Sequence, residues 1–397
     1  MIESTIVLCI LLLLAYLFDI TFAKTKIPTV ILLMILGWGV KQLVEYFEVP
    51  MLDLMPLLPV FGTIGLILII LEGSLELKMD RSKTVTIGKS FFISLLTMLT
   101  FVFGGAVYLY YFHHIPFMVG MINSIPFAVI SSAISIPSTQ NLCPENKEFA
   151  IYEGSFSDTL GVLFFNFFLI RKISEENLIG RIASMTLVII ILSLLATLLL
   201  SYLMWKIKHS VKYIPIILMS ILLFSTSEYF HIPGLIFIML FGIFLENSTK
   251  LSSIKFLKGF HPEYMNTEIK KFKDLTSEVS FLVRSVFFLL FGYLLKTSDL
   301  LNSESLPIAI IITIVIYLIR FVYLKLFRID VLPLLFIAPR GLITIVLFLS
   351  MPMEDKIPFI NQPLIVQVIL LTALIMMIEL VVLKPKKTTK TPSSQHG

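Results

Sequence analysis

Apolar residues are arranged along the chain in runs of about twenty, separated by short polar segments. Coiled as an α-helix, a run of this length crosses a hydrocarbon layer of about 30 Å. The runs are rich in Leu, Ile and Phe and lack the alternation of a membrane β-barrel strand. The pattern predicts an all-α membrane protein with about thirteen transmembrane helices. The expected helices are residues 5–23, 27–43, 54–75, 90–112, 116–137, 149–170, 183–205, 213–229, 232–246, 279–296, 307–327, 332–352 and 360–383.

The loops between these helices test the count. On one side they carry twenty-two Lys and Arg residues and on the other side six. Basic residues stay on the cytoplasmic side of a membrane, so the pattern predicts an outside N-terminus, a cytoplasmic C-terminus and a multi-pass protein of the cell (inner) membrane. No basic segment precedes the first run, which is therefore expected to remain as a helix rather than be cleaved. The long polar loop 247–278 is expected to lie along the cytoplasmic face.

Composition agrees with a membrane protein and narrows the function. The 397 residues are 57% hydrophobic and 14% charged, with a mean hydropathy of +0.96. The two cysteines, Cys9 and Cys143, exclude a disulfide framework and a cysteine metal site. No catalytic triad, zinc motif or phosphate-binding loop occurs, so we expect neither an enzyme nor a cofactor. The net charge of +5 lies in the loops, which favours lipid over nucleic acid.

Two carboxylates in the 149–170 helix carry the functional hypothesis. Asp158 lies near the middle of the span, with Ser155, Ser157 and Thr159 around it. Ionisable residues inside a membrane usually line a cavity or pair with a partner, and hard oxygen ligands suit a small cation or a proton. Glu153 is five positions earlier, about 140° around the helix, so the two carboxylates cannot easily share one partner. The alternative for Asp158 is a structural carboxylate tied to an arginine or to backbone.

Prolines interrupt two of the predicted helices. Pro137 ends the 116–137 helix and Pro339 lies in the 332–352 helix, where each removes a backbone donor and frees carbonyls. Irregular backbone persists in a membrane only where it is packed or lines a cavity. The two helices are seven apart, so they occupy corresponding places in two inverted repeats, and paired broken helices indicate a transport site at mid-membrane. We therefore expect helices 5 and 12 to be broken and to cross.

The expected organisation is one transmembrane domain, residues 1–383, followed by a short tail. The first repeat covers about 1–170, a linker helix 183–205, and the second repeat about 213–383. The tail 384–397 is rich in Lys, Thr, Ser and Pro and is expected to be disordered. Asp19 and Glu379 fall near cytoplasmic helix ends, where solvation at the membrane interface is expected.

Short motifs in these positions resemble the NhaP-type branch of the monovalent cation/proton antiporters. The stretch from Glu153 to Asp158 resembles that branch's E-x-x-x-N-D signature, and Ser135-Ile136-Pro137 its T-D-P helix break. Segments around Arg320 and around Arg340 and Gly341 resemble its two arginine-bearing segments, and Leu71 to Leu77 the end of its third helix. The resemblance implies a sodium/proton antiporter-like fold, a homodimer and a role in pH homeostasis. It also implies that Glu153 pairs with Arg340.

Two positions depart from that pattern: Ser157 stands where Asn is usual, and Ile136 replaces an Asp. The smaller Ser157 predicts a roomier, wetter cavity beside Asp158. Asp158 is expected to bind a proton and a monovalent cation in turn, with Ser131, Ser135, Ser155 or Ser157 as candidates to complete the cation shell. For Arg320 a structural partner such as a helix end is favoured.

The predicted function is therefore exchange of Na⁺ or K⁺ for protons by alternating access, one for one. A proton-coupled permease for an organic solute and a transport-inactive antiporter-like protein are the alternatives.

Overall fold

The computed structural model describes residues 2–48, 54–77, 83–139, 142–171, 213–229, 234–251, 262–300 and 302–382, with five isolated helical positions between 191 and 206. Regular structure in these ranges is helical throughout. The elements are α1 (Ile2–Thr25), α2 (Thr29–Tyr46), α3 (Leu57–Ser74), α4 (Thr84–His113), α5 (Phe117–Ala128), α6 (Ser132–Ser138), α7 (Pro144–Arg171), α9 (Tyr213–Tyr229), α10 (Gly234–Leu251), α11 (Pro262–Leu294), α12 (Thr297–Leu300), α13 (Leu306–Leu326), α14 (Val331–Leu334), α15 (Leu342–Ser350), the 3₁₀ turn η3 (Met353–Asp355) and α16 (Gln362–Val382).

Most predicted helices are present, and the two expected to be broken are broken. The 116–137 range forms α5 and α6, and the 332–352 range forms α14 and α15. Seven helices in the described ranges are long and apolar enough to cross a membrane, and three shorter ones are apolar. The linker helix 183–205, apart from isolated positions, and the tail 384–397 lie outside the described residues. The total of thirteen spans and the inverted repeat stay predictions.

One predicted loop is wrong in its second half. Residues 262–278 are not a loop but the first turns of α11, which runs for 33 residues. These turns bury Ile269 and Phe272, while Lys270 and Lys271 are exposed. Phe272 contacts the rings of Tyr213 and Phe241. A helix that is apolar on only one face has a low mean hydropathy, which is why a hydropathy window misses it.

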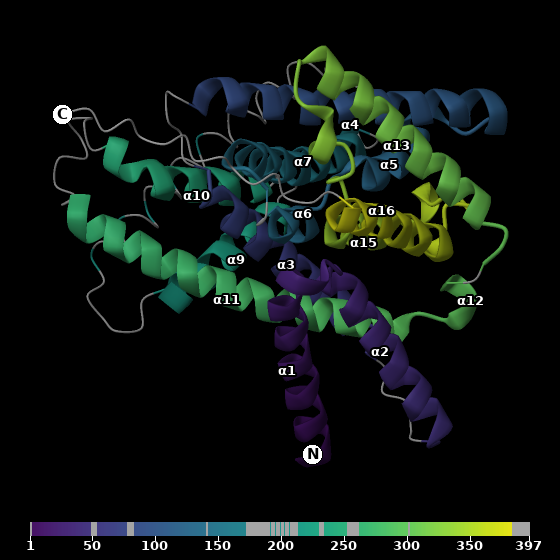
Figure 1. Cartoon of the computed structure of the whole chain (residues 1–397), viewed down its shortest axis with the longest axis horizontal. Coiled ribbons are helices and arrows are strands. Elements are labelled where there is room, and N and C mark those ends of the chain that lie inside the picture. Colours follow the sequence, from purple (N-terminus) through teal and green to yellow (C-terminus); the bar gives the residue numbers. More distant parts are fainter. Residues whose placement is uncertain are drawn as a thin grey trace, which may run out of the picture.

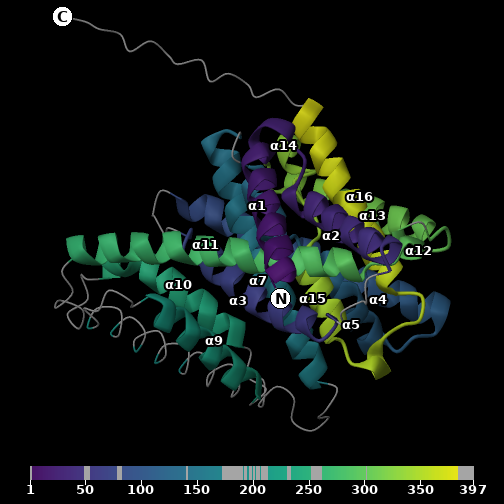
Figure 2. The ribbon, with the colours of Figure 1, turned by 90° about the horizontal axis from the view of Figure 1, so that it is seen from below.

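The helices pack in two groups. In one, α11 packs against α2 and α3, and α10 against α3 and α9; in the other, α4 packs against α5 and α7, and α13 against α16 and α4. Figures 1 and 2 show α9 and α10 toward one end of the molecule, α13 and α16 toward the other, and the long α11 running between them. The groups meet where α3 and α10 contact α7.

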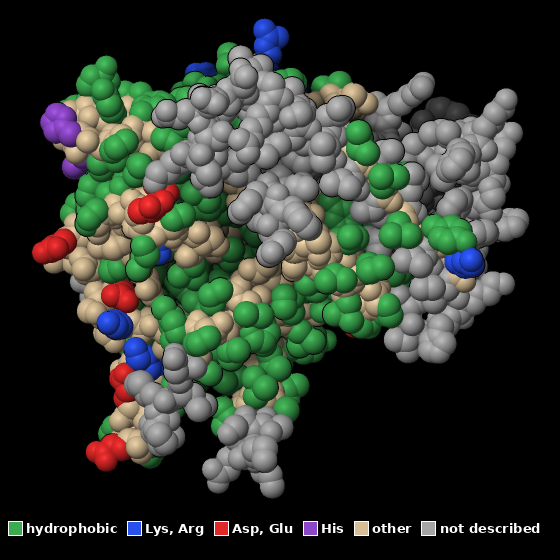
Figure 3. All heavy atoms as spheres, turned by 180° about the vertical axis from the view of Figure 1, so that it is seen from behind, with side chains coloured by type: hydrophobic (Ala, Val, Ile, Leu, Met, Phe, Trp, Pro, Cys, Tyr) green, Lys and Arg blue, Asp and Glu red, His purple; other side chains and the backbone are tan. Residues whose placement is uncertain are grey.

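The broken helix lies at the centre of this arrangement. In an apolar 18-residue window of the Phe117–Ser138 span 83% of the residues are buried, against 28% in such a window of Leu306–Leu326 in α13. The outer helices instead expose apolar side chains, including Ile311 and Leu318 of α13. Figure 3 shows apolar side chains over much of the described surface, with charged ones gathered toward its margins. This surface is suited to contact with lipid, and the irregular segment Val129–Ser131 is buried in the interior, where a membrane protein tolerates it.

Candidate ion-binding site

The two broken helices are hydrogen-bonded to each other at their irregular segments. The backbone N–H of Ser131, between α5 and α6, donates to the carbonyl oxygen of Pro339, between α14 and α15, at 2.8 Å. Gly341 caps α15 beside this bond, and a Cβ at that position would lie 2.7 Å from Ser131 Oγ. Glycine is therefore required here for the close approach of the two segments.

The break in the fifth predicted helix is not at Pro137. The chain leaves the helix at Val129–Ser131, and Pro137 lies inside α6. The T-D-P likeness at Ser135-Ile136-Pro137 therefore marked the wrong turn of the helix. A proline in a helix frees the carbonyl four residues earlier, which need not end the helix when other groups satisfy the backbone. Pro339 does lie in the irregular segment, as predicted.

Helix α7 supplies the acceptors that the start of α6 requires. Ile130 donates its backbone N–H to Ser157 Oγ at 2.8 Å, and Ser132 donates its backbone N–H to Asp158 Oδ2 at 3.1 Å. The Ser132 hydroxyl also donates to Asp158 Oδ2. The first N–H groups of a helix have no partner within it, and the positive end of the helix dipole favours a carboxylate. Asp158 and Ser157 thus hold α6 in place.

Arg340 donates hydrogen bonds to the last carbonyl groups of α5. Its Nε donates to the carbonyl of Phe127 at 2.8 Å, and another guanidinium nitrogen donates to the carbonyl of Ala128 at 3.3 Å. The last carbonyls of a helix lack partners within it and favour a cation. The side chain is 1% exposed. Arg340 therefore stabilises the break itself.

The predicted ion pair between Glu153 and Arg340 is wrong. Glu153 instead pairs with Arg320 of α13: the second guanidinium nitrogen of Arg320 lies 2.8 Å from Glu153 Oε2, and the first contacts Oε1. Both side chains are 1% exposed. Arg320 also donates to the carbonyl of Leu334, at the end of α14. Glu153 and Asp158 point in directions about 140° apart around α7, so Glu153 faces α13 while Asp158 faces α6. The rotation of α7 about its axis therefore decides which arginine Glu153 contacts.

Asp158 keeps one oxygen atom without a partner. Its side chain is 1% exposed, and Oδ1 has no hydrogen bond to any described residue. The same holds for the hydroxyls of Ser131, Ser135 and Ser155. Buried polar atoms are rarely left unpaired, so a cluster of them indicates water or an ion.

Asp158 also helps to line a small pocket. Asp158 and Ser155 line it from α7, Ser132 from α6, and Gly73 and Met239 from α3 and α10. Of the residues predicted to bind the cation, Ser155 and Asp158 therefore share the pocket. Ser131 and Ser135 are buried nearby at the α6 segment without lining it, and Ser157 is engaged with Ile130. Ser132 was missed, because placing the break at Pro137 concealed its position at the start of α6.

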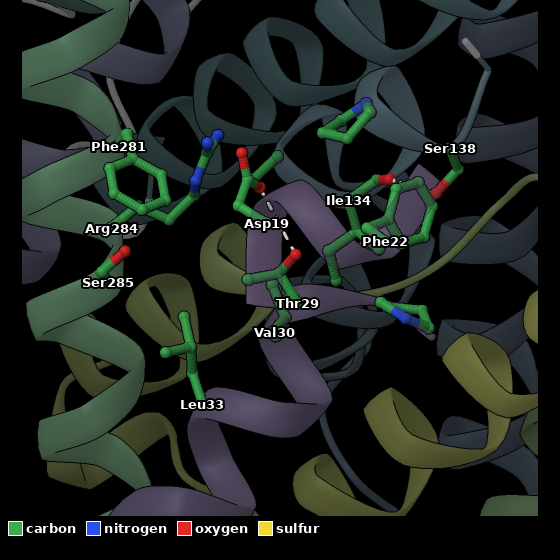
Figure 4. A pocket seen from close by; sticks show the side chains of 13 residues that line it. Asp19, Phe22, Thr29, Val30, Leu33, Ile134, Ser138, Phe281, Arg284 and Ser285 are labelled. Atoms are coloured by element: carbon green, nitrogen blue, oxygen red, sulfur yellow. Dashed lines mark hydrogen bonds between the residues drawn. The ribbon is translucent and has the colours of Figure 1, made fainter. Parts of the chain in front are cut away.

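A second pocket lies on another side of α6 (Figure 4). Asp19 of α1, Thr29 of α2, Arg284 of α11 and Ser138 of α6 line it, and Thr29 donates to Asp19 at 3.4 Å. Asp19 is exposed and Arg284 is half-buried. No group of three or more His, Cys, Asp or Glu residues in the described ranges is placed to hold a metal ion.

Buried charges at crossed broken helices, within a shell of apolar spanning helices, define a membrane carrier. Residues 9–385 match the family described as "Sodium/hydrogen exchanger, transmembrane". The chain belongs to this family, and is a multi-pass membrane transporter rather than an enzyme. No curated protein sequence matches it.

Two solved structures show the same fold. The sodium proton antiporter MjNhaP1 from Methanocaldococcus jannaschii at pH 8 superposes with a TM-score of 0.71 at 20% identity, over 96% of this chain and 98% of that chain. An electron-microscopy map of MjNhaP1 gives a TM-score of 0.66 at 20% identity, over 96% and 95%. The predicted likeness to an NhaP-type antiporter fold is thereby confirmed.

Proposed function

We propose that the protein exchanges a monovalent cation, Na⁺ or K⁺, for protons by alternating access, with Asp158 as the group that both ions share. The observation that carries the proposal is Asp158 itself, whose Oδ1 atom is buried without a partner in the described residues and whose side chain helps to line a pocket between the two helix groups. A proton and a metal ion cannot occupy the same carboxylate oxygens together. Binding of one therefore releases the other.

Two atoms on α7 are the core of the proposed cation site. Ser155 and Asp158 are three positions apart, so their side chains are neighbours on one helix face. Ser155 Oγ and Asp158 Oδ1 both lack partners among the described side chains and both belong to residues that line the pocket. Hard oxygen donors of this kind suit an alkali cation. Ser131 and Ser135, whose hydroxyls are also unpaired, are the proposed source of further oxygen atoms.

Burial explains why the exchange is obligatory. Asp158 with a proton or with one monovalent cation is neutral overall, whereas empty it is a buried negative charge, which is costly to carry through an apolar interface. Only the occupied site therefore moves between the two faces. Since a single carboxylate exchanges one charge for one charge, the transport is electroneutral.

The wider arrangement is proposed from the sequence pattern and the family likeness. The placement of basic loops supports an outside N-terminus and a cytoplasmic C-terminus. The seven-helix offset of the two broken helices supports two inverted repeats. A homodimer and a role in pH homeostasis complete the proposal.

The test is purified protein in liposomes that enclose a pH-sensitive dye. Imposed gradients of Na⁺ and K⁺ are expected to drive proton movement in the opposite direction, without generating a membrane potential. Proton flux that follows an organic solute and ignores alkali cations would instead establish a permease. Absence of any flux from correctly folded protein would establish a transport-inactive member of the family.

A further inference from the structure

A further buried carboxylate lies in the helical region, far from the Asp158 pocket in the chain. Glu379 lies on α16 and is 7% exposed, and neither of its carboxylate oxygens has a hydrogen-bond partner in the described residues. The expectation that Glu379 is solvated at the membrane interface is therefore wrong. The side chain points into the protein because it shares a helix face with Thr372 and Met376, both of which are completely buried.

Helix α13 presents two ionisable groups to this position. The Arg320 guanidinium interacts electrostatically with the Glu379 carboxylate. The hydroxyl of Tyr317 also interacts electrostatically with Glu379. Arg320 is already engaged by Glu153 and by the carbonyl of Leu334. It therefore attracts Glu379 without hydrogen-bonding to it.

No described residue that contacts α16 is hydrogen-bonded or ion-paired to Glu379. Arg340 donates its backbone N–H to Thr372 of α16, but its guanidinium is engaged by the carbonyls of Phe127 and Ala128. Tyr317 donates its hydroxyl to the carbonyl of Thr372. Helix α12, which also packs against α16, carries Asp299. Asn302, which follows α12, accepts a hydrogen bond at its carbonyl from the Gln367 side chain of α16. Gln367 is twelve residues before Glu379, about 18 Å along the helix axis. Lys325, at the end of α13, is exposed.

The two protonation states of such a group differ greatly in free energy. A neutral carboxyl without hydrogen bonds loses a few kcal/mol of hydration, whereas an ionised carboxylate in the same place loses far more. A buried acid without a free cation therefore keeps its proton. We propose that Glu379 is a second proton-binding site, separate from the transport site, and that it holds its proton while α16 packs against α13.

Loss of this proton has a defined consequence. It places a second negative charge beside Arg320, which then competes with Glu153 for the same guanidinium. The Glu153–Arg320 pair joins α7, the helix of Asp158, to α13. Proton occupancy of Glu379 thus regulates how firmly the transport helix is held.

The experiment is infrared difference spectroscopy of the full chain in liposomes, without Na⁺ or K⁺, between neutral and alkaline pH. Exposed carboxylates, with an ordinary pKa of about 4.3 for Glu, are already ionised over this range. We expect the wild type to lose protonated-carboxyl absorption in two parts. Glu379→Gln should lack one part and Asp158→Asn the other. The exposed control Glu304→Gln should keep both.

A spectrum of Glu379→Gln that equals the wild type overturns the proposal. If that variant does not fold, Glu379→Asp decides, because it keeps a carboxyl group in an altered environment. One band should then shift in frequency, and an unshifted band overturns the proposal. Because no cation gradient is used, the result is independent of whether the protein exchanges cations.

Discussion

Ser132 donates both its backbone N–H and its hydroxyl to the same oxygen of Asp158. The carboxylate thus caps α6 through Oδ2, while Oδ1 has no hydrogen bond to the described residues. Capping and ion binding are linked, because an ion that binds Asp158 also affects the hydrogen bonds that Asp158 accepts at the start of α6. An ion bound at Oδ1 therefore acts on the helix break through a single side chain.

Asp158→Asn is expected to abolish exchange and preserve the fold. Asparagine keeps an oxygen that accepts from Ser132, but it neither binds a proton nor balances the charge of a cation. The measurement is cation-driven proton flux in liposomes, with the melting temperature as the check on folding. The control is Asp330→Asn, an exposed carboxylate, which should retain full flux. Flux that persists in Asp158→Asn would show that another group carries the proton.

Glu153→Gln is expected to destabilise the protein by roughly 3–5 kcal/mol, because it leaves Arg320 buried without its counter-charge. Adding Arg320→Gln should recover part of that loss. The matched control adds Arg340→Gln instead, which should recover nothing, since Arg340 serves the carbonyls of α5. The readout is thermal or denaturant unfolding in detergent. Equal recovery by the two arginine changes would contradict the assigned pair.

Ser155→Ala and Ser157→Ala are expected to affect different properties, cation affinity and stability respectively. Ser157 accepts from Ile130, so its loss leaves a buried N–H unpaired at a cost of about 1–3 kcal/mol. Ser155 Oγ has no partner in the described residues, so its removal should leave stability unchanged and raise the cation concentration needed for half-maximal exchange. Unfolding curves and cation titrations of the two variants separate the effects. Two variants with the same profile would refute this division of roles.

Ser157→Asn tests how this position shapes selectivity. Ser157 does not line the Asp158 pocket, but it accepts a hydrogen bond from Ile130, so a larger asparagine would act on the site through the break between α5 and α6. With the smaller serine, the present site should tolerate a larger or partly hydrated ion. We expect K⁺ to be transported appreciably alongside Na⁺. The asparagine variant should favour Na⁺ more strongly and have its activity optimum at higher pH. Apparent affinities for both ions across a pH series provide the test. Identical profiles would mean that residue 157 does not influence the choice of ion.

Gly341→Ala is expected to destabilise the crossing of the broken helices. A Cβ there would meet Ser131 Oγ at 2.7 Å and Ile134 Cδ1 at 2.8 Å, closer than real contacts allow. Overpacking of this kind costs typically 1–3 kcal/mol. The control is Gly104→Ala, where a Cβ has nothing within 4 Å. The melting temperature should fall only for the first variant, and Ser131→Ala should relieve part of the fall.

Features set by local physical chemistry were predictable. A run of apolar residues forms a helix in a membrane because every backbone polar group must be satisfied within the run. The sequence therefore predicted most of the described helices and the broken character of helices 5 and 12. It also singled out Asp158, because an acid in the middle of an apolar run is costly unless it has a use. The start of α11 was missed since only one of its faces is apolar.

The sequence by itself determined the class of protein, the candidate carboxylate and the divergence of Glu153 from Asp158. The tertiary structure decided that Arg320 rather than Arg340 pairs with Glu153, that the break lies at Val129–Ser131, and that Ser132 caps onto Asp158. Glu379, expected at the interface, was also found buried only in the fold. The physical reason is the same in each case. Helical periodicity places a side chain around its own axis, but the rotation of each helix against its neighbours decides which partner that side chain meets.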